Sequence, residues 1–263
     1  MTFSVSRGPR RIVCLTEEPT EVLYRLGAGE RIVGISAFTV RPPEARRDKP
    51  VVSAFIGGSV QKIRALEPDL VIGFSDIQAD LAKQLIQANL PVLIFNQRSL
   101  QEVLDVILAI GRLVDRKAEA EALVEGYVQR LELLDAAAAR RRTRPRVYFE
   151  EWDEPMITAI RWVSELIEIA GGRNVFEARS HGKLAKERFV SAEEVVREDP
   201  EVVLASWCGK AFDRAAFEAR PGFEGVSAVR LGRVHEVPSE IILQPGPACL
   251  TDGLDFLLDI LKD

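Results

Sequence analysis

Short apolar runs alternate along the chain with segments that have helical spacing. Runs rich in Val, Ile and Leu, each bounded by Gly, Pro or Asp, predict buried strands. Strands that alternate with helices in this way are typical of a mostly parallel sheet, so the pattern predicts an α/β protein. The predicted strands are Arg11–Thr16, Arg31–Ser36, Asp69–Phe74, Pro91–Phe95, Arg146–Glu151, Glu201–Ser206 and Val234–Pro238.

Capping signals mark the ends of several helices. Ser99 with Glu102 and Ser191 with Glu194 each form an S-x-x-E capping box, which predicts a helix start. Gly27 and Gly171 stand where helices should stop.

One predicted helix is unusually long and runs from Asp115 to about Arg142, with apolar residues three or four positions apart. At 1.5 Å per residue it would extend roughly 40 Å, enough to connect two lobes. Pro145 predicts where it stops. The basic run over 140–146 fits a solvated helix end better than an anion site, because positive charge suits a helix C-terminus.

A weak internal repeat supports two similar lobes. In residues 59–72 and 191–204, a capping serine stands nine positions before a proline flanked by acids, and an apolar strand follows. We therefore expect two Rossmann-like α/β lobes over 1–113 and 143–263, joined by a linking helix over 114–142. The space between such lobes is a natural ligand site.

Composition excludes several function classes. The chain has 263 residues, 47% of them hydrophobic, which suffices for a sizeable core. Its 35 basic and 40 acidic residues give a net charge of -5, so no excess of positive charge favours nucleic acid. No run approaches the ~20 apolar residues of a membrane span. The N-terminal residues lack the apolar core of a signal peptide, so as written the chain is expected to be cytoplasmic.

Motifs for catalysis are missing from the sequence. It contains no glycine-rich phosphate loop and no nucleophile elbow. Its two histidines, His181 and His235, have no metal-ligand spacing. Its three cysteines, Cys14, Cys208 and Cys249, are far apart and predict reduced thiols. We expect neither a metal site nor a catalytic cofactor.

Aromatic and acidic residues gather at predicted strand ends. The carboxyl ends of strands line the cleft in open α/β sheets, so flat side chains there would offer stacking surfaces to a bulky ligand. Plain core packing is the alternative for any single phenylalanine. The acidic run over 150–154 favours a solvated strand end with one ligand-facing acid over a catalytic pair. The aromatic candidates are Phe38, Phe55, Phe74, Trp152 and Trp207.

Seven segments carry a resemblance to a known family: 11–27, 33–36 with the prolines at 42–43, 63–72, 149–155, 169–176, 191–200 and 206–210. Through their order the chain resembles the class III substrate-binding proteins of ABC transporters. The Glu-Glu-Trp and Trp-Cys-Gly elements point to the vitamin B12 (cobalamin) branch.

The resemblance implies two α/β lobes joined by a rigid helix, a ligand held in the cleft with little hinge motion, and no catalysis. It implies a monomer that binds a corrinoid between the five aromatic candidates above. Glu150, Glu151 and Lys210 are candidate polar contacts to that ligand.

Relatives of this kind dock on a permease through one glutamate per lobe, at the third residue of each repeat helix. The matching positions are Gln61 in the first lobe and Glu193 in the second. A neutral amide loses the charge that would steer docking. The resemblance implies a periplasmic protein if the true start lies upstream, and otherwise a cytoplasmic member with another purpose.

Two alternatives stay open. A haem or iron-siderophore ligand would require an axial His or Tyr, or basic groups around an anionic chelate. A corrinoid-handling enzyme or metal-cluster protein of the cytoplasm would require Cys14, Cys208 and Cys249 to converge.

Overall fold

The chain divides into two compact units in the computed structural model, which describes residues 8–262. The first unit comprises the residues up to Gln97 together with Gln101–Gly126, and the second comprises Arg98–Leu100 with the residues from Tyr127 onwards. This division runs through the long helix, which the sequence interpretation set apart as a linker. The predicted limits 1–113, 114–142 and 143–263 stay a prediction. Most of the segment behind the signal-peptide expectation, residues 1–7, lies outside the described residues.

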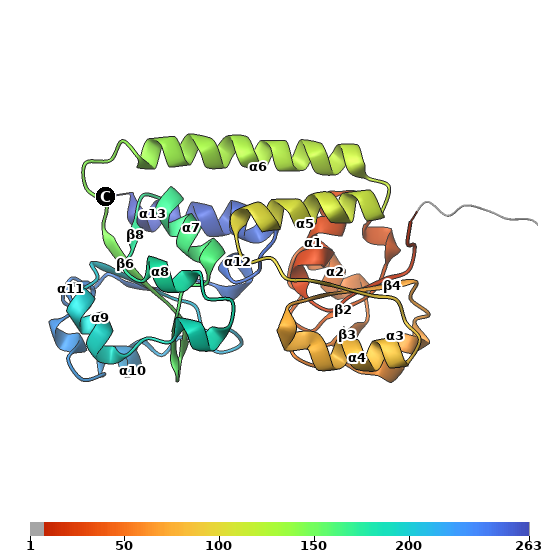
Figure 1. Ribbon diagram of the computed structural model, residues 1–263, viewed down its shortest axis with the longest axis horizontal. Coiled ribbons are helices and arrows are strands. Elements are labelled where there is room, and N and C mark those ends of the chain that lie inside the picture. The colour runs from red at the N-terminus through yellow and green to blue at the C-terminus, as the bar shows by residue number, and fades with distance from the viewer. Residues whose placement is uncertain (1–7, 263) are drawn as a thin grey trace, which may run out of the picture. The chain divides into compact units, whose positions relative to one another are not determined.

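The first half of the chain forms one parallel sheet with helices on either side (Figure 1). Its strand order is β3-β2-β1-β4-β5, so β1 lies at the centre. The elements are β1 (Ile12–Cys14), α1 (Glu17–Arg25), β2 (Ile32–Ser36), α2 (Pro43–Asp48), β3 (Val51–Ser53), α3 (Val60–Ala65), β4 (Leu70–Phe74), α4 (Ala79–Gln87), β5 (Val92–Phe95) and α5 (Leu100–Leu113).

The helix α6 (Lys117–Ala138) is the longest helix in the part of the chain that the structure describes. Its 22 residues correspond to about 33 Å. It begins two residues later than predicted because Asp115 has a left-handed backbone, with φ of 56°, which a helix cannot continue through. Gly111 of α5 lets α6 approach closely, since a Cβ at that position would overlap Ala120.

The second half forms a mixed sheet of order β10-β9-β6-β7, with β8 also paired to β6. All its pairs are parallel except β6 with β7, which form an antiparallel hairpin. The elements are β6 (Arg146–Asp153), β7 (Met156–Thr158), α7 (Arg161–Ile169), β8 (Arg173–Asn174), α8 (Glu177–Ser180), α9 (Ala192–Glu198), β9 (Val202–Ala205), α10 (Arg214–Glu218), α11 (Ser227–Arg230), β10 (Val234–Glu236), α12 (Ser239–Ile242) and α13 (Leu254–Leu261).

The predicted α/β class, with mostly parallel sheets and one long helix, is confirmed. All seven predicted strands are present. The prediction missed β3, β7 and β8, which contain only two or three residues each. Runs this short carry too little periodicity to stand out from the loops around them.

The two repeated segments have the same cap. The Ser59 hydroxyl accepts a hydrogen bond from the Lys62 N–H at 3.2 Å, and the Ser191 hydroxyl accepts one from the Glu194 N–H at 3.3 Å. The Glu194 carboxylate accepts the Ser191 N–H in return at 2.9 Å, which confirms the second capping box. The box at Ser99 stays a prediction.

The helix stops are confirmed as well. Gly27 and Gly171 follow the last turns of α1 and α7 with φ of 67° and 90°, values that a residue with a Cβ rarely adopts.

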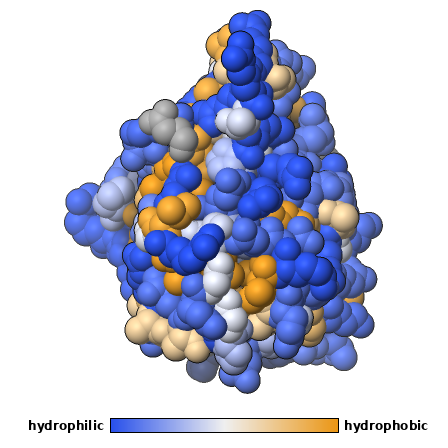
Figure 2. Space-filling view, turned by 90° about the vertical axis from the view of Figure 1, so that its left-hand side faces the viewer, coloured by the Kyte–Doolittle hydropathy of each residue, from blue (hydrophilic) through white to orange (hydrophobic). Residues whose placement is uncertain are grey.

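Each unit has its own apolar core between sheet and helices. Seven buried residues form the first: Val13, Leu15, Val52, Ile63, Val71, Leu81 and Leu85. The second is richer in rings and includes Tyr148, Phe176, Phe217 and Phe223. Figure 2 shows a surface on which hydrophobic residues are scattered among hydrophilic ones, as is normal for a chain exposed to water.

Replacing Ser191 by Ala should lower the free energy of unfolding by about 1 kcal/mol, because the first turn of α9 loses its cap. Urea denaturation measures this change. Ser191→Asp, which keeps an oxygen acceptor at the cap, should retain most of the stability. Equal losses in the two variants would show that the cap does not stabilise α9.

Candidate ligand-binding site

Two aromatic rings lie together at the carboxyl ends of β2 and β3. Ser36 and Ser53 are register partners on these parallel strands, and Phe38 and Phe55 each follow two residues later. Their ring centroids are 6.4 Å apart with an interplanar angle of 86°, an edge-to-face pair. Phe38 is 42% exposed. The first unit therefore presents an aromatic surface to solvent at this edge of its sheet.

Phe74 has a different environment. It ends β4 and is only 6% exposed, so it belongs to the packed layer of the unit. The buried Gln78 ties its backbone to that of Phe55. The Gln78 carboxamide accepts the Phe74 N–H at 3.0 Å and donates to the Phe55 carbonyl at 2.9 Å. Gln78, which sequence reasoning missed, thereby fixes the loop that carries Phe55.

Three glutamates at the start of α1 are buried just after β1: Glu17, Glu18 and Glu21. Burial raises the pKa of Glu18 to about 8, although the Thr16 hydroxyl donates a hydrogen bond to its carboxylate at 2.8 Å and opposes this shift. Glu21 accepts hydrogen bonds from Arg25 and Arg41. This cluster was not predicted, because its members read as ordinary polar positions of a helix start.

The second unit repeats the arrangement with tryptophans. Glu150 of β6 is the register partner of Ala205 of β9, and Trp152 and Trp207 each follow two residues later. The Lys210 ammonium lies 4.5 Å from the centroid of the Trp152 ring and 4.7 Å from that of Trp207. It also lies 2.7 Å from the Asp153 carboxylate. The structure thus brings two candidate aromatic residues together around a third candidate, Lys210.

A buried ion pair lies beneath this cluster. Glu150 is completely buried, and its carboxylate accepts two hydrogen bonds from Arg220 at 2.5 and 3.0 Å. It also accepts the Tyr148 hydroxyl at 2.9 Å and the Trp207 indole N–H at 3.1 Å. Burial raises the pKa of Glu150, and the Arg220 guanidinium opposes that shift.

The expected solvated strand end is therefore wrong for Glu150, because a carboxylate with four donors needs no water. Glu151 points to the opposite face of the strand. There it pairs with Arg188, whose side chain is 4% exposed and also donates to the Thr158 carbonyl at 2.7 Å. Ligand contacts by Glu150 and Glu151 stay predictions, and each would require one of these bonds to be exchanged.

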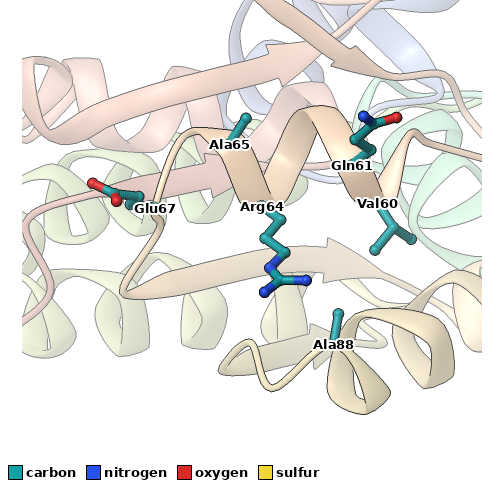
Figure 3. A pocket seen from close by; sticks show the side chains of 6 residues that line it. All are labelled: Val60, Gln61, Arg64, Ala65, Glu67 and Ala88. Atoms are coloured by element: carbon teal, nitrogen blue, oxygen red, sulfur yellow. The ribbon is translucent and has the colours of Figure 1, made fainter.

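The two predicted docking positions lie on matching helices. Gln61 in the first turn of α3 and Glu193 in the first turn of α9 are both exposed. A hydrogen bond from Ser191 lowers the pKa of Glu193, so this side chain is charged at neutral pH. Along α3 lies an open pocket of about 610 Å³, lined by Val60, Gln61, Arg64, Ala65, Glu67 and Ala88 (Figure 3). Arg64 points towards Ala88, whereas Gln61 points away from it (Figure 3).

The histidines and cysteines lie in ordinary structural positions. His181 follows α8 and contacts the Glu177 carboxylate at 2.7 Å, and burial lowers the pKa of His235 in β10. Burial raises the pKa of Cys14 to about 12, which keeps this thiol protonated. Over residues 8–262, no group of three or more His, Cys, Asp or Glu side chains could hold a metal ion.

A sequence model described as periplasmic binding protein matches residues 12–241. The chain belongs to the periplasmic binding protein family. A vitamin B12-binding protein of Vibrio campbellii is 30% identical over 214 residues, which cover 77% of this chain and 73% of that relative. An ABC transporter substrate-binding lipoprotein of Bacillus subtilis is 26% identical over 97% of this chain and 81% of its own length.

Solved structures of periplasmic binding proteins have the same fold. The periplasmic vitamin B12 binding protein of Vibrio cholerae has a TM-score of 0.74 and 25% identity, and the alignment covers 97% of both chains. A haem complex of an S. aureus protein, IsdE, has a TM-score of 0.82 at 20% identity, covering 97% of this chain and all of that one. The resemblance to class III binding proteins is thereby confirmed.

The comparisons also bear on location. The Bacillus subtilis relative is named as a lipoprotein and the Vibrio cholerae protein as periplasmic, so the cytoplasmic expectation finds no support in these names. No helix in the described part of the chain is both long and apolar enough to cross a membrane.

Replacing Arg220 by Met should lower the free energy of unfolding by about 3 kcal/mol, because the Glu150 carboxylate would stay buried without its countercharge. Chemical denaturation followed by tryptophan fluorescence measures the loss. Arg214→Met removes the exposed pair with Glu218 and should cost less than about 1 kcal/mol. Adding Glu150→Gln to Arg220→Met should recover part of the stability, and a further loss would contradict this account.

Glu18 predicts a pH dependence of stability. Its pKa of about 8 in the folded chain exceeds the ordinary 4.5, so the folded state keeps a proton that the unfolded state loses. The free energy of unfolding therefore falls as pH rises between these two values. Relative to the unsubstituted chain, Glu18→Gln should gain on the order of 3 kcal/mol between pH 5 and pH 8.

Urea denaturation across this pH range measures the gain. Glu44→Gln, at an exposed position of α2, should follow the unsubstituted chain at every pH. A constant difference between Glu18→Gln and the unsubstituted chain would show that Glu18 ionises normally.

Proposed function

We propose that this periplasmic binding protein binds cobalamin or a related corrinoid without transforming it, and delivers it to an ABC transporter permease. The observation that supports this most is the pair of aromatic surfaces, Phe38 with Phe55 and Trp152 with Trp207, each placed toward the carboxyl ends of two adjacent parallel strands. Relatives named for vitamin B12 or cobalamin binding add independent support.

Stacking on aromatic rings suits a corrinoid because the macrocycle is large and its faces are mainly apolar. Removing apolar surface from water stabilises a complex by roughly 25 cal/mol per Å². A 42% exposed phenylalanine such as Phe38 has apolar area left to bury in this way. The polar groups at the edges of such a site then fix orientation rather than affinity.

A haem or iron-siderophore ligand is the competing proposal. The haem complex described above has the same fold as this chain. A haem site calls for an axial His or Tyr. His181 contacts Glu177 beyond the end of α8, His235 lies within β10, and the Tyr148 hydroxyl is bonded to Glu150. None of these three directly follows the carboxyl end of a strand, where the aromatic surfaces lie, and the other two tyrosines, Tyr24 and Tyr127, lie within the helices α1 and α6. For this reason we propose the corrinoid first.

Delivery would involve the exposed residues Gln61 and Glu193. In this proposal Glu193 supplies a charged contact to the permease and Gln61 a neutral hydrogen bond. Complementary charge mainly raises the association rate, so docking through one glutamate should be slower than docking through two.

Titration of the purified chain with cyanocobalamin should quench tryptophan fluorescence, because two of the three tryptophans lie at the proposed site. The quenching should saturate at one ligand per chain. Haemin and a ferric siderophore, titrated in parallel, should give no saturable quenching. Saturation with haemin and none with cyanocobalamin would transfer the assignment to haem.

Replacing Trp152 by Ala should weaken cyanocobalamin binding about tenfold. Stacking of one nucleic-acid base on an aromatic side chain is worth about 1–3 kcal/mol, and we expect a similar contribution from the stacked corrinoid. Leu231→Ala is the matched control. It removes an exposed apolar side chain of the same unit, but at the amino end of β10. Equal affinity of the two variants would argue against Trp152 as a ligand contact.

A further inference from the structure

A cation of the chain itself occupies the aromatic surface of the second unit. The Lys210 ammonium lies within 5 Å of the centroids of both Trp152 and Trp207 and forms an ion pair with Asp153 at 2.7 Å. The partners come from two places, the end of β6 and the loop after β9. An ammonium over an indole face is attracted by the negative potential of the ring, and a carboxylate beside it adds to the attraction.

The Trp207 ring is held in place by its other contacts. Its indole N–H donates to Glu150, and its ring meets Phe212 nearly edge to face, with centroids 5.0 Å apart at 76°. These contacts fix where the ring lies. Lys210 lies over its face, and Trp207 is only 4% exposed although it follows a strand end. A flat ligand cannot stack on that face while the Lys210 side chain lies there.

The Lys210 side chain has access to water. It is 41% exposed, and the partner that anchors it, Asp153, is 24% exposed, so water can solvate both groups after they separate. An exposed ion pair of this kind is worth about 1 kcal/mol or less. Leaving the ring faces therefore costs little compared with stacking a macrocycle on them.

We propose that Lys210 is a built-in competitor for the aromatic surface: it covers the indole faces of the free protein, and a flat ligand must displace it in order to bind. This inference rests on the proposed function, because it takes Trp152 and Trp207 as the rings on which the ligand stacks. Lys210 then determines specificity. A small aromatic compound gains too little contact to displace the ammonium, whereas an extended macrocycle gains enough.

The direction in which one substitution changes the Kd separates this role from a direct ligand contact. Lys210→Ala removes the competitor and should lower the Kd for cyanocobalamin about tenfold. Asp153→Asn keeps Lys210 but weakens its anchor, so it should lower the Kd by a smaller factor. Lys183→Ala, which removes an exposed positive charge elsewhere in the same unit, should leave the Kd unchanged. An unchanged or higher Kd in Lys210→Ala would overturn the proposal.

A measurement without ligand separates failure of the covering role of Lys210 from failure of the proposed function. Trp162 and Trp207 are only 3% and 4% exposed, so acrylamide quenching of the protein reports mainly on Trp152. Lys210→Ala should raise the quenching constant about twofold, because an indole face loses its cover. Greater quenching without binding of any tetrapyrrole would uphold the covering role and reject the corrinoid function. Equal quenching in the two proteins would reject the covering role itself.

Discussion

Burying the Glu150 carboxylate would cost several kcal/mol unless each of its oxygens met a donor. Three residues supply those donors: Tyr148 in β6, Trp207 in the loop after β9 and Arg220 in the loop after α10. One charge thereby ties three separate parts of the second unit together. The contact of Lys210 with the Trp152 and Trp207 rings depends on the buried Glu150 carboxylate, because the Trp207 indole is oriented by its bond to Glu150.

The first unit reaches a similar result without a charge. The Gln78 carboxamide ties the backbone of Phe55, one member of the aromatic pair, to that of Phe74 at the end of β4, whereas Glu150 bonds to a ring directly. In each unit, two aromatic residues follow a register pair of adjacent parallel strands by two positions. Rings fixed before a ligand arrives lose little conformational entropy on binding, so this common design favours affinity.

Most of the fold, and the position of the aromatic residues after strands, could be predicted from the sequence. Strands buried on both faces read as continuous apolar runs, and the aromatic residues directly after them could be placed at one sheet edge. The partners of the polar residues could not be predicted. Arg220 is 70 residues from Glu150, and Lys210 is 57 from Asp153. No local pattern encodes such pairings. The short strands β7 and β8 were missed because their pairing with β6, rather than their composition, makes them strands.

In the function proposed above, a corrinoid stacks on the aromatic rings of this chain. Calorimetric titration with cyanocobalamin at several temperatures tests it most directly, because burial of apolar surface gives binding a negative heat-capacity change. Stacking of a corrinoid predicts one ligand per chain and a binding enthalpy that becomes more negative as temperature rises. Absence of binding heat at every temperature, or an enthalpy independent of temperature, would contradict it.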